Sequence, residues 1–189
     1  MSCIDPWDIP LSLLPPNNSQ ARQQDALGLL KAYSLVTGQV DNKTVSLHRL
    51  VHVATRNWLR SRETLEQWTV HTRKRLKDIF PSNEHKNRTL WREYLPHALF
   101  ILQSKELQDD QQDREHLAYQ VAKCLFSDGR YVQAGALFKE VFEKQSKRLK
   151  NDDEGILTSM AWLASTYQKL GRWMEAENLD VSVITSTRA

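Results

Sequence analysis

The chain has 189 residues, of which 40% are hydrophobic and 26% are charged, and its formal net charge is +3. This composition is ordinary for a globular protein of one or two domains, and so small a charge does not indicate a nucleic-acid partner. No segment has the ~18 uncharged apolar residues of a membrane span, and the start lacks the basic region and apolar core of a signal peptide. We therefore expect a cytoplasmic protein that does not bind a membrane.

Residues 1–60 predict a winged-helix-like domain. Four prolines in the first sixteen residues disfavour an early helix. A helix is expected over residues 19–32, followed by a β-hairpin in which YSLVTG and KTVSLH flank the turn residues GQVDN. The helix after the hairpin places five apolar residues on one stripe, which we expect to be packed: Leu47, Leu50, Val51, Ala54 and Trp58.

Residues 61–112 predict a helical linker. Its first helix, about residues 63–80, carries the basic sequence RKRLK, which we expect to face outward. The residues expected to face inward are Leu65, Trp68, Leu76 and Ile79. A further helix, about residues 89–107, contains Pro96, which either kinks it or begins a second segment.

Residues 113–189 repeat at an offset of 42 positions, which gives two repeats, 113–154 and 155–189: DGRYVQAGALFKEV aligns with LGRWMEAENLDVSV. In each copy a small residue, Ala122 or Ala164, lets two helices approach, and a glycine, Gly129 or Gly171, suits the left-handed turn after the first helix. The pattern predicts tetratricopeptide (TPR) helical hairpins, of the long type found in kinesin light chains, which they resemble. The expected fold is therefore mainly α: a winged-helix-like domain with a small β-hairpin, an α-helical linker and an α-solenoid of TPR hairpins.

Several stretches together resemble fungal NB-ARC/TPR proteins, which are signal-transducing (STAND) NTPases related to NOD-like receptors: MSCIDPWDIPLSLL, LKAYSLV, LHRLVHVATRNWLR, YLPHALFIL and the repeats. The resemblance implies that His48 senses the nucleotide in a full-length parent, although Arg49 stands where the family has an acidic residue. No P-loop sequence occurs, so we expect ADP or ATP only in that parent. For this chain we expect no cofactor and no enzymatic activity.

The other side chains with chemical potential are weak candidates. His48 and His52 lie one helical turn apart but lack the glutamate of HExxH and a third ligand, so we predict no metal site. We interpret His52 as the rim of the packed stripe. The remaining histidines are expected at the surface: His71, His85, His97 and His116. Four tryptophans on apolar faces are expected in the core: Trp58, Trp68, Trp91 and Trp173. No catalytic residue is predicted, and Cys3 and Cys124 are expected to be free thiols.

A peptide-binding groove along the first helices of the repeats is the strongest candidate site. Its predicted residues are His116, Tyr119, Lys123, Phe126, Thr158, Ser165, Gln168 and Lys169. The lysines favour an acidic segment or a C-terminal carboxylate of a partner protein. We interpret the chain as a non-enzymatic protein-interaction and regulatory module, and as a fragment of a fungal signalling NTPase that lacks its P-loop domain.

Two alternatives remain open. One is a winged-helix DNA-binding regulator with a TPR tail, in which arginines near the recognition helix contact phosphates: Arg49, Arg56, Arg60 and Arg62. The other is a kinesin-light-chain-like cargo adaptor, which shares the repeat length.

Overall fold

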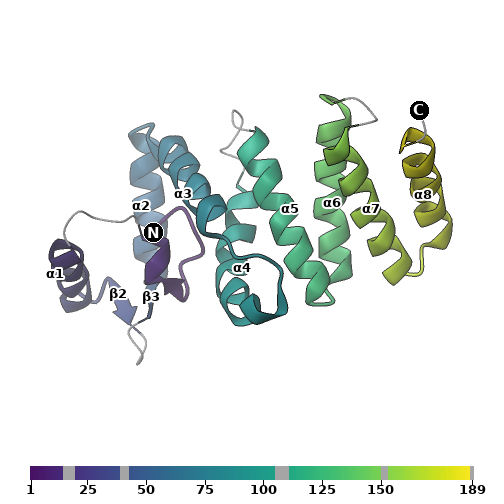
Figure 1. Cartoon of the computed structure of the whole chain (residues 1–189). Coiled ribbons are helices and arrows are strands. Elements are labelled where there is room, and N and C mark those ends of the chain that lie inside the picture. Colours follow the sequence, from purple (N-terminus) through teal and green to yellow (C-terminus); the bar gives the residue numbers. More distant parts are fainter. Residues whose placement is uncertain (15–19, 39–42, 105–110, 150–152, 188–189) are drawn as a thin grey trace. The chain divides into compact units, whose positions relative to one another are not determined.

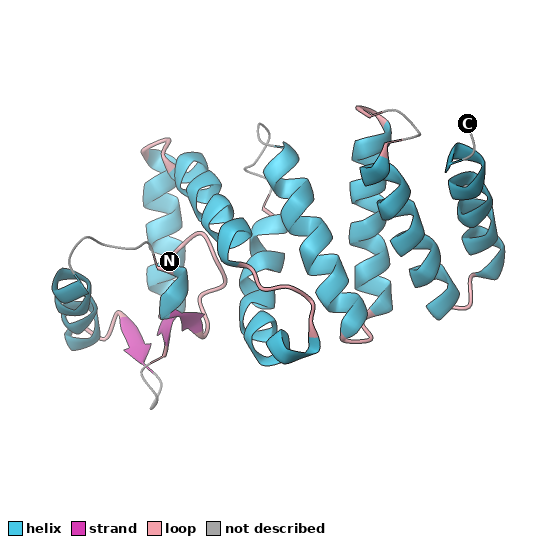
Figure 2. Cartoon of the chain, viewed as in Figure 1, coloured by secondary structure: helices cyan, strands magenta, loops and turns pink. Residues whose placement is uncertain are grey.

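A computed structural model describes residues 1–14, 20–38, 43–104, 111–149 and 153–187 (Figure 1). Within these residues the chain forms eight α-helices, two short 3-10 helices and one small sheet, so the mainly helical fold class is confirmed (Figure 2). The chain divides into two compact units. Unit 1 comprises Met1–Pro81 and Lys86–Asp113, and unit 2 comprises Ser82–His85 and Arg114–Ala189. The domain limits predicted above stay a prediction.

Unit 1 begins with a small antiparallel sheet flanked by helices. Its elements in chain order are β1 (Ile9–Pro10), α1 (Gln20–Ala32), β2 (Val36–Gly38), β3 (Thr44–Leu47), α2 (Arg49–Ser61), α3 (Leu65–Ile79) and α4 (Arg88–Leu102). β2 and β3 form the predicted hairpin, although four of its five turn residues, 39–42, lie outside the described part. β1 was not predicted; it pairs with the other edge of β3, where Pro10 opposes Thr44. A proline is tolerated there because an edge strand does not need every amide donor.

The predicted packing of α2 is wrong. Leu47 is buried, but Leu50 and Trp58 are 72% and 56% exposed, and Ala54 is exposed as well. α2 instead buries His52 and Leu59, which lie seven residues apart on the neighbouring side of the helix. The N-terminal residues pack against that side, as the hydrogen bond between the His52 ring and the Ile4 carbonyl shows. Helical periodicity could not reveal this contact, because it joins residues 48 positions apart.

In α3 and α4 the predictions hold in part. Leu65 and Leu76 are buried as expected, whereas Trp68 is half-exposed and Arg73, expected to face outward, is completely buried. α4 ends at Leu102 rather than near residue 107, and it continues through Pro96 without interruption. Trp91 lies in the core of unit 1, as predicted.

The helices of unit 2 form two hairpins, α5 (Gln111–Ser127) with α6 (Tyr131–Ser146) and α7 (Glu154–Lys169) with α8 (Trp173–Thr187). The first three residues of α5 fall within unit 1. Gly129 and Gly171 adopt positive φ angles of 77° and 74°, which confirms the predicted left-handed turns. In both hairpins the amide after the glycine donates to the carbonyl five residues earlier, as Arg130 does to Leu125 and Arg172 to Tyr167 at 2.9 Å. This 6→1 bond is the signature of a Schellman cap.

Small residues at matching positions allow the helices of unit 2 to approach closely. Ala122, Ala134, Ala164 and Ala176 are all buried, as the repeat pattern predicted. Trp173, predicted to be in the core, is instead 67% exposed. Tyr131, at the same position of the first hairpin, packs edge-on against Phe126 at 5.2 Å, whereas the second hairpin has Gln168 at the position equivalent to Phe126.

Candidate functional site

The first helices of the two hairpins carry the predicted groove residues on matching stripes. His116, Tyr119, Lys123 and Phe126 recur at three- and four-residue spacing along α5. Thr158, Ser165 and Lys169 lie on one side of α7, and Trp162 lies between them at the same spacing. We call the surface formed by Tyr119, Lys123, Phe126 and Trp162 the α5/α7 face.

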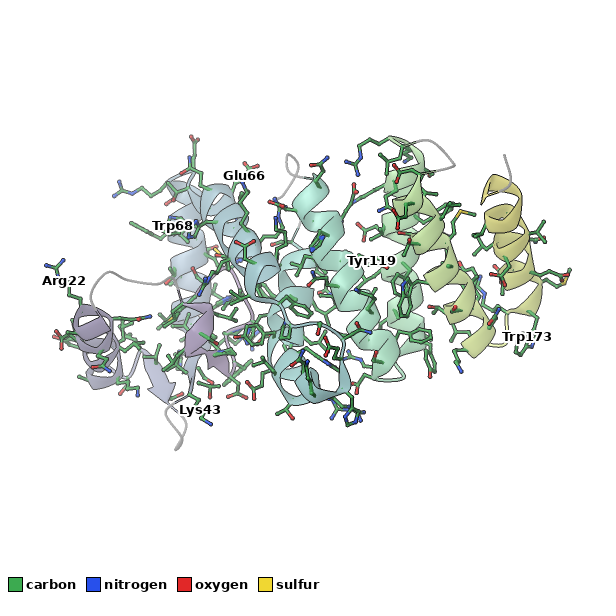
Figure 3. The ribbon with its side chains drawn as sticks, viewed as in Figure 1. Arg22, Lys43, Glu66, Trp68, Tyr119 and Trp173 are labelled. Carbon is green, nitrogen blue, oxygen red and sulfur yellow. The ribbon has the colours of Figure 1, made fainter. Side chains whose placement is uncertain are left out.

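Aromatic contacts join the residues of this face to one another. The Lys123 ammonium lies 4.9 Å above the centre of the Tyr119 ring, and the Phe126 ring meets Trp162 edge-on at 5.4 Å. Beneath them the buried Phe138 of α6 stacks on Trp162 at 5.6 Å and contacts the edge of Tyr119 at 5.9 Å. Because the four surface side chains remain partly exposed above a fixed phenyl ring, they form a platform that loses little side-chain freedom on binding. Figure 3 labels Tyr119 on this face.

The other predicted groove residues have contacts of their own. His116 is exposed and pairs with Gln120 at 2.7 Å on α5. The Thr158 hydroxyl donates to the Glu154 carbonyl, and the Gln168 amide donates to Asp180 on α8 at 3.1 Å. Ser165 is half-buried and Lys169 is exposed.

Sequence reasoning missed Trp162, Phe138 and Tyr131, whose rings complete the aromatic cluster. A signal for Trp162 was present, because it falls on the Thr158–Ser165 stripe. Phe138 and Tyr131 lie within the aligned repeat sequences, but the repeat does not indicate that Tyr131 contacts Phe126 of its own hairpin while Phe138 also reaches Trp162 of the next one.

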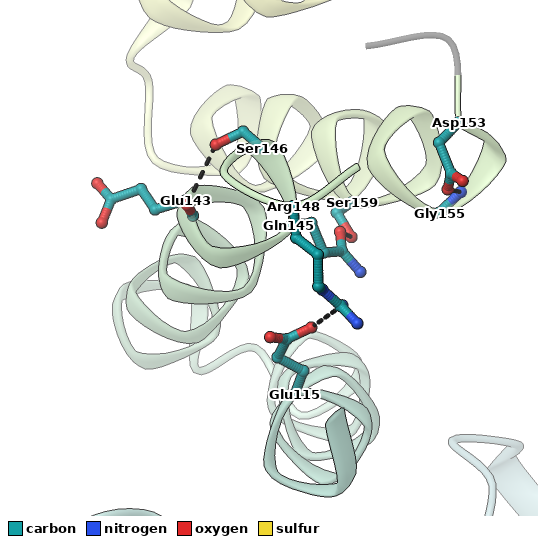
Figure 4. A network of polar contacts seen from close by, with 8 residues as sticks. All are labelled: Glu115, Glu143, Gln145, Ser146, Arg148, Asp153, Gly155 and Ser159. Carbon is teal, nitrogen blue, oxygen red and sulfur yellow. Dashed lines mark hydrogen bonds and ion pairs between the residues drawn. The ribbon is translucent and has the colours of Figure 1, made fainter. Parts of the chain in front are cut away.

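Hydrogen bonds and ion pairs connect the start of α5, the end of α6 and the start of α7 (Figure 4). Glu115, which is 5% exposed, accepts a hydrogen bond from Arg148 at 2.7 Å, and Gln145 of α6 accepts one from the Ser159 hydroxyl of α7 at 2.7 Å. Glu140 binds both Arg114 and Lys144. Burial raises the pKa of Glu140, but the hydrogen bonds and charges of these two cations outweigh it and lower the pKa below its usual range. These bonds join α5 to α6 and α6 to α7, which keeps the α5/α7 face in register.

A cavity of about 350 Å³ lies elsewhere in unit 2. Its walls include Val132 and Lys139 of α6 and Tyr167 and Arg172 at the end of α7. The Arg172 guanidinium stacks 4.2 Å from the centre of the Tyr167 ring and pairs with Glu175. This cavity shares no residue with the α5/α7 face, and no predicted groove residue lines it.

In unit 1, side chains of α2 and α4 bind the backbone of residues 1–10, which we call the N-terminal strap. His52 Nε2 lies 3.1 Å from the Ile4 carbonyl, His97 Nε2 lies 3.3 Å from the Asp8 carbonyl, and the Arg56 guanidinium donates to the Ser2 carbonyl at 3.1 Å. A carbonyl can only accept, so each histidine carries a proton on Nε2. The rim position predicted for His52 and the surface position predicted for His97 are therefore wrong: the two side chains are 6% and 1% exposed.

Burial lowers the pKa of both strap histidines. For His52 the Arg56 charge acts in the same direction, while the Ile4 carbonyl and Asp5 oppose it. For His97 the Asp8 carbonyl, Asp5 and the Asp8 carboxylate oppose the effect of burial without cancelling it. Both rings are therefore neutral near pH 7.

His48 has a local structural role in α2. It is the N-cap residue, and its Nδ1 accepts a hydrogen bond from the Leu50 amide at 3.2 Å, while its side chain stays exposed. Its implied nucleotide-sensing role stays a prediction. Cys3 and Cys124 are free thiols, as predicted, and burial raises the pKa of Cys124 to about 12.

Two kinds of feature are absent from the described residues. No three His, Cys, Asp or Glu side chains there gather in a way that could hold a metal ion. None of the helices in that part of the chain is long and apolar enough to cross a membrane.

Comparison with known proteins finds a relative in sequence. The chain is 33% identical over 161 residues, 85% of its length, to a "nucleotide-binding leucine-rich repeat (NLR)-like protein" of Hyaloscypha variabilis. The aligned part covers 16% of that relative, so the chain spans about one sixth of its length. No protein-family model matches the chain.

Among solved structures, two crystal structures align with the chain. Both are of TPR-like repeats of a "putative kinesin light chain" from Podosopora anserina, and one of them carries a single glutamine-to-methionine substitution. Each aligns with a TM-score of 0.42 and 18% identity, and the alignment covers 88% of this chain and 87% of theirs.

Proposed function

We propose that the chain is a non-enzymatic module that binds a segment of a partner protein on the α5/α7 face. The observation that carries the proposal is the cluster of Tyr119, Lys123, Phe126 and Trp162, which keeps three aromatic rings and a cation partly exposed on one rigid surface. Aromatic residues of this kind dominate the binding energy of protein interfaces.

The chemistry of the face defines the class of ligand. Lys123 and the exposed Lys169 offer positive charge on α5 and α7. The partly exposed rings of Phe126 and Trp162 offer apolar contact to a side chain of the ligand. We therefore infer an acidic segment, or a C-terminal carboxylate, that also carries an apolar or aromatic residue.

Short fluorescent peptides test this inference. An acidic peptide that contains phenylalanine and ends in a free carboxylate should bind, as measured by fluorescence anisotropy, and a version with lysine in place of each acid should not. Trp162→Ala and Lys123→Ala should each weaken binding by about tenfold, as expected for residues at the centre of an interface.

Matched controls come from the residues of α6 that line the separate cavity. Val132→Ala and Lys139→Ala remove one apolar residue and one cation that line the separate cavity, so they should leave peptide affinity unchanged. Equal losses in the control pair and the face pair, or equal binding of the acidic and basic peptides, would contradict the proposal.

We also propose that the chain works as a regulatory part of a longer signalling protein in the cytoplasm. The similarity to an NLR-like protein about five times its length supports this assignment. In such a parent His48 would face a bound nucleotide, whereas the peptide-binding work would belong to unit 2. Nucleotide affinity of the parent, compared between the natural protein and His48→Gln, tests the first part separately from the second.

The DNA-binding alternative is less well supported by the geometry of α2. Arg56 is half-buried, donates to the Ser2 carbonyl and lies 5.5 Å from the centre of the Phe100 ring. Arg62 stacks on Trp58 at 5.6 Å. A titration of random duplex DNA over a range of salt concentrations tests this alternative, because phosphate contacts would give a steep fall of affinity with salt.

A further inference from the structure

Unit 1 contains a cavity of about 520 Å³ that the function proposed above does not use. It is bounded by the N-terminal strap, the start of β3 and the first half of α4. The charged and aromatic residues that line it are Asp5, Trp7, Asp8, Arg92, Glu93 and His97. All of these residues belong to unit 1, so the cavity is independent of the α5/α7 face.

The strap holds Trp7 firmly although the indole itself is 60% exposed. The Leu47 amide donates to the Pro6 carbonyl at 2.7 Å, the Trp7 amide donates to the Asp5 carboxylate at 2.9 Å, and the Asp8 amide donates to the Ser46 hydroxyl at 2.9 Å. Asp8 has a φ of 49°, in the left-handed region that non-glycine residues rarely occupy. The backbone on both sides of Trp7 is therefore fixed, and the exposed indole lines the cavity, where a ligand can stack on it.

The walls of this cavity are predominantly negative. Asp5, Asp8 and Glu93 provide three carboxylates against the single guanidinium of Arg92, and the neutral His97 adds no charge, which leaves a formal charge of −2. Charged walls on a concave surface concentrate ions of the opposite sign. The ligand should therefore be a cation.

The hydrogen-bonding groups of the cavity also favour a ligand rich in donors. His97 uses Nε2–H to bind the Asp8 carbonyl, so its Nδ1 carries a lone pair. That Nδ1 is buried and forms no hydrogen bond among the described residues. The nearby Asp5 carbonyl raises the pKa of the ring, but burial outweighs this effect and the net pKa is lowered. The Asp5 carboxylate accepts from the Trp7 amide and the Asp8 carboxylate from the Ser46 hydroxyl, but a carboxylate can accept several hydrogen bonds. These carboxylates, Glu93 and the buried Nδ1 therefore suit a ligand with several N–H groups.

We propose that this cavity binds the guanidinium of an arginine side chain on a partner protein, stacked on Trp7 and hydrogen-bonded to the surrounding carboxylates. A guanidinium is planar, so it can lie on an indole while its five N–H groups reach carboxylates at its edge. Metal ions are a poorer match, because no three acidic or histidine side chains in the described part of unit 1 converge as metal ligands. The site is separate from the peptide-binding surface, so either could exist without the other.

The test uses the full chain and Nα-acetyl-L-arginine amide, which represents an arginine residue within a protein. Its neutral isostere, Nα-acetyl-L-citrulline amide, is the control ligand. The indole N–H resonance of Trp7, assigned from its loss in Trp7→Leu, should shift with arginine amide at a Kd of about 1 mM, the affinity expected of so small a ligand. The same resonance should not move with the citrulline amide, and added salt should weaken the arginine response.

Variants on the two sides of unit 1 make the test specific. Glu93→Gln should weaken the affinity for arginine amide by about fivefold, as expected for the loss of one charge. Trp7→Leu removes the stacking partner and should weaken the affinity by a similar factor. Because this variant lacks the indole resonance, its affinity is measured by calorimetry. Glu66→Gln and Trp68→Leu make the same changes on the exposed side of α3 and should leave the affinity unchanged (Figure 3). The proposal is overturned if citrulline amide binds equally well, if the α3 variants have the same effect, or if free L-arginine binds while the capped amide does not.

Discussion

The two units are stabilised by different kinds of contact. Unit 2 buries apolar and small side chains between helices that are close in sequence, with Phe138, Ala122 and Ala164 completely inaccessible. Unit 1 holds its N-terminal strap through polar side chains that reach carbonyls far along the chain, 48 positions for His52 and 89 for His97. Unit 2 should therefore respond mainly to changes of volume, and unit 1 to changes of protonation.

The largest expected effect is that of Phe138→Ala on unit 2. This ring is buried under Tyr119 and Trp162, so its removal loses both apolar burial and two aromatic contacts. We expect the free energy of unfolding to fall by about 3–5 kcal/mol, the usual cost of a buried Phe→Ala substitution. Urea denaturation measures the loss, and hydrogen exchange followed by mass spectrometry should locate it in α5–α8.

Phe142→Ala is the matched control for this prediction. Phe142 is only half-buried on the next turn of α6, so its loss should cost clearly less. If exchange in α2 and α4 rose as much as in α5–α8, the view of two separately stabilised units would be wrong.

Acidification should instead weaken unit 1. The folded state lowers the pKa of His52 and His97. Well above pH 6.5 both histidines are neutral in the folded and in the unfolded chain, so they do not make the free energy of unfolding depend on pH there. Below about pH 6.5 the unfolded chain takes up protons that the folded unit resists, and stability falls by at most about 1.4 kcal/mol per pH unit for each histidine. The fall stops once the pH is below the lowered pKa values. Hydrogen exchange of α2 and α4 between pH 7.5 and 5 measures it.

The double variant His52→Gln/His97→Gln isolates this effect, because glutamine can still donate to a carbonyl but does not titrate. Burial also lowers the pKa of the Met1 α-amino group. This group adds a further loss of unfolding free energy on acidification, which begins near pH 8 and should remain in the double variant. Unit 2 should stay stable over this range, since the lowered pKa of Glu140 costs stability only when the pH falls below about 4.5. A slope that persists unchanged in the double variant would contradict the assignment to the histidines.

The sequence predicted unit 2 better than unit 1 because contacts between neighbouring helices leave a regular pattern in the sequence, whereas polar contacts between distant segments do not. The 42-residue repeat marks the turn glycines and the small residues of each hairpin, because neighbouring helices pack with a regular spacing that the sequence must match. In unit 1 the helical periodicity of α2 pointed to Leu50 and Trp58, but the strap covers the His52 side instead. Periodicity finds the apolar side of a helix and cannot identify which side a distant segment covers with polar contacts.

Glycine substitutions should have opposite effects in the two units. Gly129 has a positive φ, and a Cβ built there meets no atom within 4 Å, so Gly129→Ala carries a backbone penalty without a clash. We expect a loss of about 1–2 kcal/mol. Gly28 lies inside α1 and is equally unobstructed, so Gly28→Ala should raise the helicity of α1 and stabilise it by up to about 1 kcal/mol.

Thermal unfolding shows whether each glycine variant is less stable or more stable than the natural protein. Gly129→Asn is the control for the first, because asparagine tolerates the left-handed region better than alanine and should recover part of the loss. A stabilising Gly129→Ala would mean that the α5–α6 turn does not have the Schellman geometry in solution.

The smallest expected effect is that of His48→Ala, and it is local to unit 1. Alanine cannot accept the hydrogen bond that the Leu50 amide donates to His48 Nδ1, so the first turn of α2 loses its cap. The cost should be about 0.5–1 kcal/mol, and His48→Ser or His48→Asn should avoid it because both are good N-cap residues. The amides of the first turn of α2 should exchange faster in the alanine variant, while peptide binding by unit 2 stays unchanged. A nucleotide-sensing residue in a parent protein would behave differently, because there serine would restore the helix cap without restoring the nucleotide response. Comparing His48→Ala with His48→Ser in both the chain and its parent therefore separates the structural role of this histidine, which the hydrogen bond supports, from the functional role implied by resemblance.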